Sequence, residues 1–317
     1  NGGTHNVGVG IDTLAAIVSG ARNVAIGNNA LDAADGAESD NVAIGYNAMT
    51  ETNDDGALKN TVIGTYAMQD SLGASYENTF IGYGAGGGAW TGSPSIRNTG
   101  IGRGVMSAAM DAGNDNTAVG HGALDLLTTG NDNACFGSNA GNSITDGGTN
   151  TMIGVGTDVA SSGNDNSSAF GNGAIGAGTN TISIGNTSVS TIAGQVSFST
   201  YSDKRIKKDI EDTNIGLDFI KELKPRKFKR VCAKDYPEVI QTKYDKTAPD
   251  LTEPDRVVDG LIAQEVKETM DSMGVSFSGW NEDDNSKQKL QYATFIMPLI
   301  KAVQELTAKV EALEDAQ

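Results

Sequence analysis

The sequence predicts a mainly β protein: a repetitive β-solenoid shaft, or β-helix, followed by a small α+β domain that ends in a coiled coil. Three observations predict it. A five-residue unit recurs through the first half, composition changes near residue 200, and a heptad pattern closes the chain. Residues 1–201 hold 37 of the 41 glycines with 4 basic and 17 acidic residues, whereas residues 202–317 hold 19 basic and 23 acidic ones. The predicted domains are therefore 1–198 and 199–317.

The repeated unit has the form Asn-x-x-x-Gly, and NVAIG occurs unchanged at 23–27 and 41–45. There are about eleven copies, most of them 17–20 residues apart. Their closing glycines are Gly10, Gly27, Gly45, Gly64, Gly82, Gly102, Gly120, Gly137, Gly154, Gly171 and Gly185. A short β-branched segment between Asn-, Asp- and Gly-rich turns predicts one strand per coil. Stacked coils then form a solenoid of roughly 50 Å at ~4.8 Å per step.

Side chains alternate between the two faces of a strand. The residues one and three positions after each Asn, such as Val24 and Ile26, are mostly β-branched, and we expect their face to be buried in the shaft. The residue two positions after Asn lies on the other face. It is Gly8, Ala25, Ala43, Val62, Phe80, Gly100, Ala118, Cys135 or Met152, and never charged. We expect this second face to be buried against other copies of the chain. The alternative is that these residues simply face solvent.

These repeats resemble the glycine-rich repeat heads of trimeric surface adhesins and the shafts of phage tail fibres. The second half adds four segments in order: SDKRIKKDI at 202–210, GLDFIKELKPRKFKR at 216–230, GLIAQEV at 260–266 and YATFIMPLIKAVQELTAKVEAL at 292–313. Together they resemble the C-terminal intramolecular chaperone of endosialidase-type phage tailspikes. The resemblance implies a domain that trimerises, guides folding of the β-helical shaft and then cuts itself off with a serine–lysine dyad.

Carried onto this sequence, the dyad is Ser202 and Lys207. The amine takes the place of a histidine base. Only a neutral amine can act as a base, and the surrounding cluster of Lys and Arg favours that form. A five-residue offset does not align two side chains on a helix, so a bend or a neighbouring chain must join them. We expect the cut at Tyr201–Ser202, with Ser202–Asp203 as the alternative. The basic run could also be only a solvated loop.

Three further elements are expected in the second half. Leu217, Ile220 and Leu223 predict a helix, with Asn214 as its N-cap. The apolar residues at 257–262 predict a strand that leads into a helix from about Gln264. A final helix over 294–316 carries a heptad seam, which we expect to form a trimeric coiled coil. The seam residues are Leu299, Val303, Leu306, Val310 and Leu313.

Composition excludes several function classes. The net charge of −17 opposes nucleic-acid binding, and no apolar stretch is long enough for membrane insertion. Cys135 and Cys232 cannot form a zinc site or a disulfide framework, and we expect no cofactor and no metal. Acidic turn residues could bind Ca²⁺, but turn formation explains them better. The only histidines, His5 and His121, lie in repeats, so a Ser-His-Asp triad lacks its base.

The expected function is that of a phage tail fibre or spike for host attachment, located in the virion tail. Its chaperone would be a self-cleaving serine endopeptidase that acts once. Expected partners are two further copies in a homotrimer, a host-surface receptor or glycan, and other virion tail proteins. One alternative is a trimeric adhesin on a bacterial cell surface that keeps an uncleaved chaperone cap. Another is a polysaccharide-degrading tailspike.

Overall fold

The computed structural model describes residues 3–33, 37–50, 56–70, 74–90, 92–189, 191–195, 198–241, 245–247, 250–251, 253–283 and 286–316. The chain divides into two compact units, Asn1–Asn186 and Thr187–Gln317, and each is described by itself. The sequence analysis placed the domain boundary twelve residues later, after residue 198.

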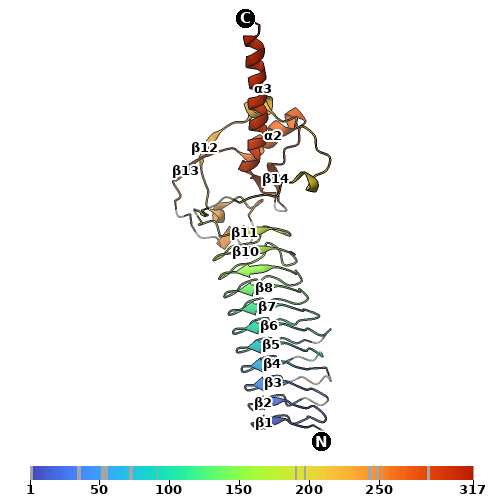
Figure 1. Ribbon diagram of the computed structural model, residues 1–317. Coiled ribbons are helices and arrows are strands. Elements are labelled where there is room, and N and C mark those ends of the chain that lie inside the picture. The colour runs from blue at the N-terminus through green and yellow to red at the C-terminus, as the bar shows by residue number, and fades with distance from the viewer. Residues whose placement is uncertain are drawn as a thin grey trace. The chain divides into compact units, whose positions relative to one another are not determined.

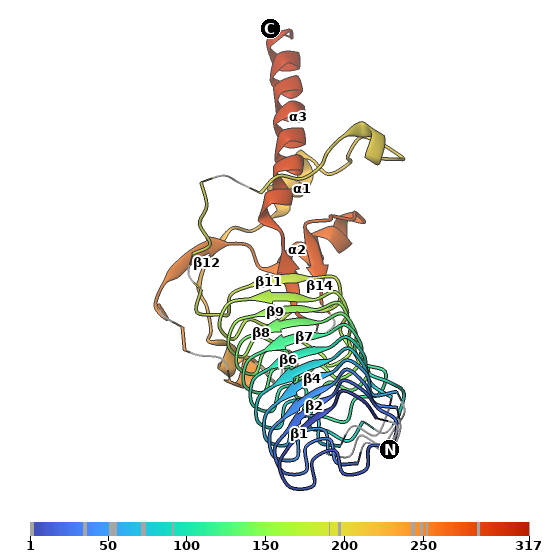
Figure 2. The ribbon, with the colours of Figure 1, turned by 60° about the horizontal axis from the view of Figure 1, so that its bottom comes forward.

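The first unit is a β-solenoid, as predicted (Figure 1). Its described strands form one parallel sheet in which each strand pairs with the next along the chain, so Val42 lies opposite Thr61 and Ile44 opposite Ile63. Seen towards its end, the coils lie in register over one another (Figure 2). The strands are β1 (Val7–Val9), β2 (Val24–Ile26), β3 (Val42–Ile44), β4 (Thr61–Ile63), β5 (Thr79–Ile81), β6 (Thr99–Ile101), β7 (Thr117–Val119), β8 (Ala134–Phe136), β9 (Thr151–Ile153), β10 (Ser168–Phe170) and β11 (Ile182–Ile184).

The predicted assignment of the two strand faces is wrong. The residue two positions after Asn points into the coil of its own chain, where Val62, Phe80 and Met152 are fully buried. The residues on either side of it face outward, and large apolar side chains such as Ile101 and Phe136 are 39% and 41% exposed. The reason is geometric: a three-residue strand in a narrow coil has one inward position, its centre.

Two columns of buried side chains fill the interior of this unit, and the first comes from the strand centres, one residue per coil. Gly100 follows Phe80 in the next coil, and a Cβ on Gly100 would lie 2.6 Å from the Phe80 ring, so the glycine makes room for the ring. A second column comes from the turn after each strand. There Met49, Met68 and Leu124 are fully buried with left-handed backbone at φ 46° to 53°. Burial of about 1.5–3 kcal/mol per side chain offsets the ~1–2 kcal/mol of that conformation.

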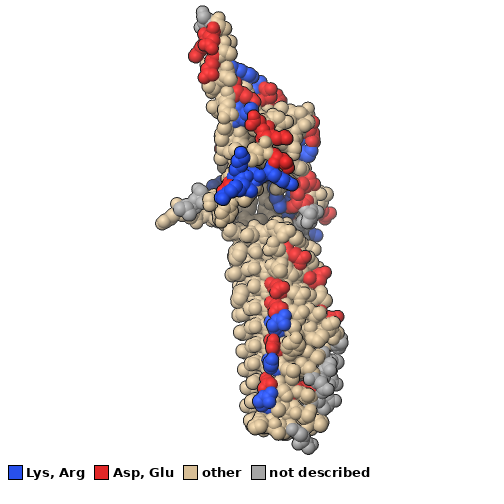
Figure 3. All heavy atoms as spheres, turned by 45° about the vertical axis from the view of Figure 1, so that its right-hand side comes forward, with Lys and Arg blue, Asp and Glu red and all other residues tan. Residues whose placement is uncertain are grey.

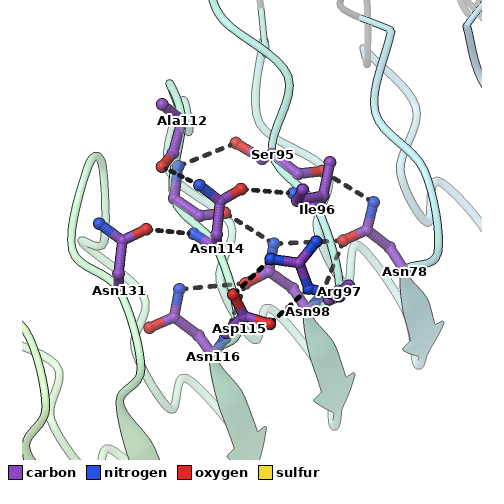
Figure 4. Close-up of polar contacts among 11 residues, drawn as sticks. Asn78, Ser95, Ile96, Arg97, Asn98, Ala112, Asn114, Asp115, Asn116 and Asn131 are labelled. Carbon is purple, nitrogen blue, oxygen red and sulfur yellow. Dashed lines mark hydrogen bonds and ion pairs between the residues drawn. The ribbon is translucent and has the colours of Figure 1, made fainter.

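A ladder of buried asparagines runs beside these columns (Figure 4). Each amide nitrogen donates to the Oδ1 of the asparagine one coil earlier at 3.0–3.3 Å, and each backbone N–H donates to that same oxygen. The amide nitrogen of Asn98 also donates to the Gly113 carbonyl at 2.8 Å. The ladder therefore satisfies backbone groups that no strand pairing reaches. Its fully or almost fully buried members are Asn23, Asn41, Asn60, Asn78, Asn98, Asn116, Asn133 and Asn150.

The residue before each ladder asparagine from Asn23 to Asn133 is charged and faces solvent, and together these residues form a column of charge (Figure 3). In it Arg22 pairs with Asp40 at 2.5 Å, Lys59 with Glu77 at 3.1 Å, and Arg97 with Asp115 at 2.6 Å. Hydrogen bonds from the guanidinium groups hold the pKa of Asp40 and of Asp115 below the usual carboxyl range. Exposed pairs of this kind stabilise a fold by at most about 1 kcal/mol each. Their main consequence is that they occupy three of the four basic side chains of residues 1–201.

The second unit is a small α+β region, as predicted. Four short 3-10 turns, Lys204–Ile206, Ala233–Asp235, Asp245–Thr247 and Tyr292–Phe295, accompany its longer elements. Its core joins Phe219, Val266, Met270, Phe277 and Phe295, with the Phe277 and Phe295 ring centres 4.6 Å apart. The helices and strands are α1 (Leu217–Glu222), β12 (Arg226–Lys229), β13 (Val257–Gly260), α2 (Ala263–Met273), β14 (Trp280–Glu282), β15 (Gln288–Leu290) and α3 (Ile296–Glu314).

Helix α1 is capped from a distance. The predicted N-cap Asn214 is wrong: the cap position is Gly216, and the Leu217 N–H donates to the Glu305 carboxylate on α3 at 2.8 Å. A carboxylate at a helix N-terminus is favourable because it accepts from an unpaired N–H and complements the helix dipole. This contact ties the first helix of the unit to its last helix across 88 residues.

The asparagine ladder yields a prediction about stability. In Asn98→Ala, the Gly113 carbonyl and the Asn116 N–H lose their partners in a buried site. We expect the free energy of unfolding to fall by roughly 3 kcal/mol or more, at about 1–3 kcal/mol per unpaired group. Urea denaturation followed by circular dichroism measures it. Asn172→Ala, at an exposed position of the same solenoid, is the control and should leave the midpoint unchanged. Equal midpoints for the two variants would contradict the ladder's role.

Candidate functional site

The two predicted dyad residues lie in direct contact. The Nζ of Lys207 donates a hydrogen bond to the Oγ of Ser202 at 2.7 Å, within one chain. Both side chains are exposed, and so is the neighbouring Tyr201, at 94%. The contact has the distance needed for proton transfer between an amine and a serine hydroxyl.

A single 3-10 turn, Lys204–Ile206, brings the pair together. Asp203 caps this turn, since its carboxylate accepts from the Arg205 N–H at 2.8 Å. The Lys207 N–H closes the turn on the Lys204 carbonyl at 3.1 Å, after which the chain becomes extended at φ −121° and ψ 145°. The bend that the five-residue offset requires is therefore local, and no second chain is needed to form the contact.

The turn also carries an ion pair of its own. The Arg205 guanidinium binds both oxygens of Asp203, with contacts of 2.6 and 3.1 Å. Hydrogen bonds from Arg205 lower the pKa of the Asp203 carboxyl, and the same pairing raises the pKa of Arg205. A carboxyl whose folded pKa is lowered stabilises the fold above its ordinary pKa and loses that effect as pH falls through the lowered value. The turn should therefore persist into moderately acidic solution.

Helix α3 places the five predicted seam residues on a free face. Leu299, Val303, Leu306, Val310 and Leu313 are all exposed, Val303 at 63%. Pro298 and Ala302 on the other side are buried, on the side where α1 packs and Glu305 caps it. The helix proper begins at Ile296, two residues after the predicted start, because residues 292–295 form a 3-10 turn. An apolar groove lined by Ile296, Leu299, Ile300, Val303 and Gln304 opens along this face.

Other candidate chemistry is limited. Cys135 is buried in the solenoid interior, and this burial raises the pKa of its thiol far above the ordinary value, so it remains a protonated packing residue. Within the part of the chain that the structure describes, there is no group of three or more His, Cys, Asp or Glu side chains placed to hold a metal ion. In that same part, none of the helices has the length and apolar character to span a membrane.

Residues 202–275 match the model of a peptidase family described as chaperone of endosialidase. The match begins at Ser202 and spans the 3-10 turn Lys204–Ile206, which we call the dyad turn, together with α1, β12, β13 and α2. No curated protein and no solved structure matches the chain significantly. The family match and the β-solenoid fit a tail-fibre-like protein with a C-terminal chaperone domain, and they confirm the resemblance predicted from the four sequence segments.

The Asp203 cap yields a prediction about the dyad turn. Asp203→Ala removes both the cap and the partner of Arg205, whereas Asp203→Asn keeps a capping oxygen and loses only the charge. We expect amide protection in the 204–207 segment to fall severalfold in Asp203→Ala and less in Asp203→Asn, measured by hydrogen exchange near neutral pH. Because the pKa of Asp203 is lowered, the wild-type protection should be full above the ordinary carboxyl pKa and should fall as pH drops through the lowered value. Equal protection in all three proteins would show that Asp203 does not hold the turn.

Proposed function

We propose that the chain is a tail-fibre or spike protein for host attachment, whose C-terminal domain directs folding of the β-solenoid as a trimer and then releases itself. The contact between Ser202 and Lys207 carries this proposal, because it lies at the first residue of the region that matches the endosialidase chaperone family. Release at this point would separate the shaft, 1–201, from the folding domain, 202–317. The proposed location is the virion tail.

The proposed cut is an acyl shift followed by hydrolysis. Neutral Lys207 accepts the Ser202 hydroxyl proton while Oγ attacks the Tyr201 carbonyl carbon. The C–N bond between Tyr201 and Ser202 breaks, and the proton passes from Lys207 to the departing amine. Water then cleaves the resulting ester, leaving a carboxylate on Tyr201 and a free amino group and hydroxyl on Ser202. The reaction uses one water and no cofactor.

We propose that assembly triggers the cut. In the single chain the dyad is exposed, so water can solvate the ammonium form of Lys207. Covering this segment with neighbouring chains would disfavour the charged amine and supply the neutral base. A folding domain that cuts only after its trimer has formed would leave no unfinished shafts.

The proposed trimer contact uses a different strand position from the one predicted from the sequence, which was the residue two positions after Asn. Because the residue two positions after Asn fills the interior of its own chain, the residue three positions after Asn must supply the outer apolar surface. This residue ends the strand, and the last residue of each of the eleven strands is Val, Ile or Phe, including Ile26, Ile101, Phe136 and Ile153. Continuous apolar ridges of this kind are typical of protein interfaces. The exposed α3 seam is the second surface that would join three copies in parallel.

Mass spectrometry of the expressed chain tests the cut and locates the bond. Ser202→Ala should leave the chain whole, since the nucleophile is gone. Lys207→Ala and Lys207→Arg should also leave it whole, because a guanidinium cannot act as a base near neutral pH. Lys204→Ala is the matched control: it removes a charge from the same turn but not the 2.7 Å contact, and cutting should continue.

Three outcomes would contradict parts of this assignment. Loss of cutting in Lys204→Ala with cutting retained in Lys207→Ala would assign the base elsewhere. A wild-type chain that folds, trimerises and stays whole would favour the alternative function, an adhesin that keeps its chaperone as a permanent cap. A mass that begins at Asp203 would move the cut to the alternative bond, Ser202–Asp203.

Light scattering tests the two proposed trimer surfaces. Ile101→Asp places a charge on the outer strand face, and Leu306→Asp places one in the helix seam, so each should reduce the trimer mass towards that of a monomer at micromolar concentration. Leu126→Asp alters an equally exposed apolar residue away from both surfaces and should leave the mass unchanged. Trimers that persist in both Ile101→Asp and Leu306→Asp, or a monomeric wild type, would refute the interface.

A further inference from the structure

A column of rings and one cation lies on the solenoid corner that follows the strands. Its members are Tyr46, Tyr66, Tyr83, Arg103 and His121, one from each of five consecutive coils. Tyr46 meets Tyr66 edge to face at 5.4 Å between ring centres, and Tyr66 meets Tyr83 in the same way at 5.7 Å. The Arg103 guanidinium lies over the Tyr83 ring, 5.8 Å from its centre. We call this set the tyrosine–arginine column.

Backbone hydrogen bonds fix the spacing of the column. The Tyr66 N–H donates to the Tyr46 carbonyl at 3.0 Å, and the Gly104 N–H donates to the Tyr83 carbonyl at 2.9 Å. Tyr46, Tyr83 and Arg103 each follow a closing glycine directly, whereas Tyr66 lies one residue further along its coil, after Thr65. The members still come from successive coils, which lie at the ~4.8 Å spacing of paired strands. This spacing is similar to the length of one sugar ring in a polysaccharide, so a linear sugar chain can follow the column in step.

Two of the three tyrosine rings are exposed and the ring between them, Tyr66, is half-buried. Tyr46 is 45% exposed and Tyr83 is 53% exposed, and neither belongs to the buried core. The edge-to-face contacts order the rings while leaving part of each in solvent. Exposed, ordered tyrosines present an apolar face to the C–H groups of a sugar and a hydroxyl to its oxygens.

Arg103 distinguishes this column from the rest of the shaft. The other three basic side chains of residues 1–201, Arg22, Lys59 and Arg97, are held by carboxylates in the charge column. Among the ion pairs of the described residues, Arg103 has none, and its ordered contact is with the Tyr83 ring. The column itself contains no carboxylate. An exposed guanidinium beside an aromatic ring has the donor geometry to bind a carboxylate with two parallel hydrogen bonds.

We propose that the tyrosine–arginine column binds a polysaccharide that contains uronic acids, with the rings stacked on the sugars and Arg103 paired to a carboxylate. One cation among several rings suits a polymer whose charge is sparse. A phosphate backbone carries one charge per nucleotide and would need several cations, whereas Arg103 is the only Lys or Arg of the column. The inference rests on the proposed role in host attachment and assigns that role a surface and a ligand class.

Isothermal titration of the full-length chain tests the proposal. The probes are hyaluronate and heparosan oligosaccharides, in which a uronic acid alternates with a neutral sugar, each compared with its carboxyl-esterified form. Wild type should bind at least one acid form more tightly than its ester. Arg103→Ala should weaken the acid form about tenfold and remove the preference for acid over ester. Tyr83→Ala should weaken both forms, and Tyr83→Phe, which keeps the ring and is the variant least disturbing to the fold, should retain most of the binding.

Lys59→Ala is the matched control, because it removes an exposed cation from the charge column and should leave binding unchanged. No binding of any acid probe by wild type, or equal losses in Arg103→Ala and Lys59→Ala, would overturn the proposal. A changed oligomer mass in Tyr83→Ala would overturn it too, since the column would then be a contact between chains. If the wild-type chain cuts itself and trimerises but binds no acid probe, only this inference fails and the proposed function stands. If it binds the probes but neither cuts nor trimerises, the proposed function fails and the binding surface stands.

Discussion

The solenoid depends on one constraint: each coil encloses an interior so narrow that water cannot enter, while its backbone still turns several times. An inward polar group is therefore costly unless it is hydrogen-bonded to a neighbouring coil. The strand centres supply the apolar column, and the ladder asparagines supply the hydrogen bonds. Asparagine suits the ladder because its short side chain carries both donors and an acceptor, so identical residues can bond to one another in succession. The closing glycines follow from the same tightness: at Gly102, where φ is +142°, a Cβ would lie 2.3 Å from the Gly120 carbonyl oxygen.

This constraint also determines what the outer surface can do. One inward position per strand fills the interior. The two flanking strand positions, and the corners of the coil before and after the strand, face outward and can carry different kinds of side chain. The strand face became an apolar ridge, the corner before the strand a column of ion pairs, and the corner after it a column of rings with Arg103. Because the coils stack in parallel register, equivalent residues of successive coils lie over one another. The same kind of side chain repeated at one position therefore forms a continuous surface along the solenoid.

Helix α3 of the second unit is likewise divided between a side that packs within its own chain and a side that faces solvent. The side of α3 that carries Pro298, Ala302 and Glu305 is occupied within its own chain, and Glu305 caps α1. The opposite side keeps its apolar seam in solvent. The dyad turn is different, because its geometry comes almost wholly from local hydrogen bonds between Asp203, Arg205 and the backbone of residues 204–207. A contact built in this way forms within a single chain.

The sequence by itself determined the solenoid and the helix seam, because each rests on a period: one strand per repeat or one apolar face per heptad. The α+β region followed from local helix and strand patterns and from the resemblance of four segments. It also identified the pair Ser202 and Lys207 from the wording of one segment, although not the 3-10 turn that joins them. Only the tertiary structure decided which strand face is inside. Alternation shows that Phe80 and Ile81 face opposite ways, but both are apolar, and only the closed coil shows which one has room. The ladder and the Glu305 cap were missed for a related reason: their partners lie 14 to 20 and 88 residues away, at distances that folding alone brings together.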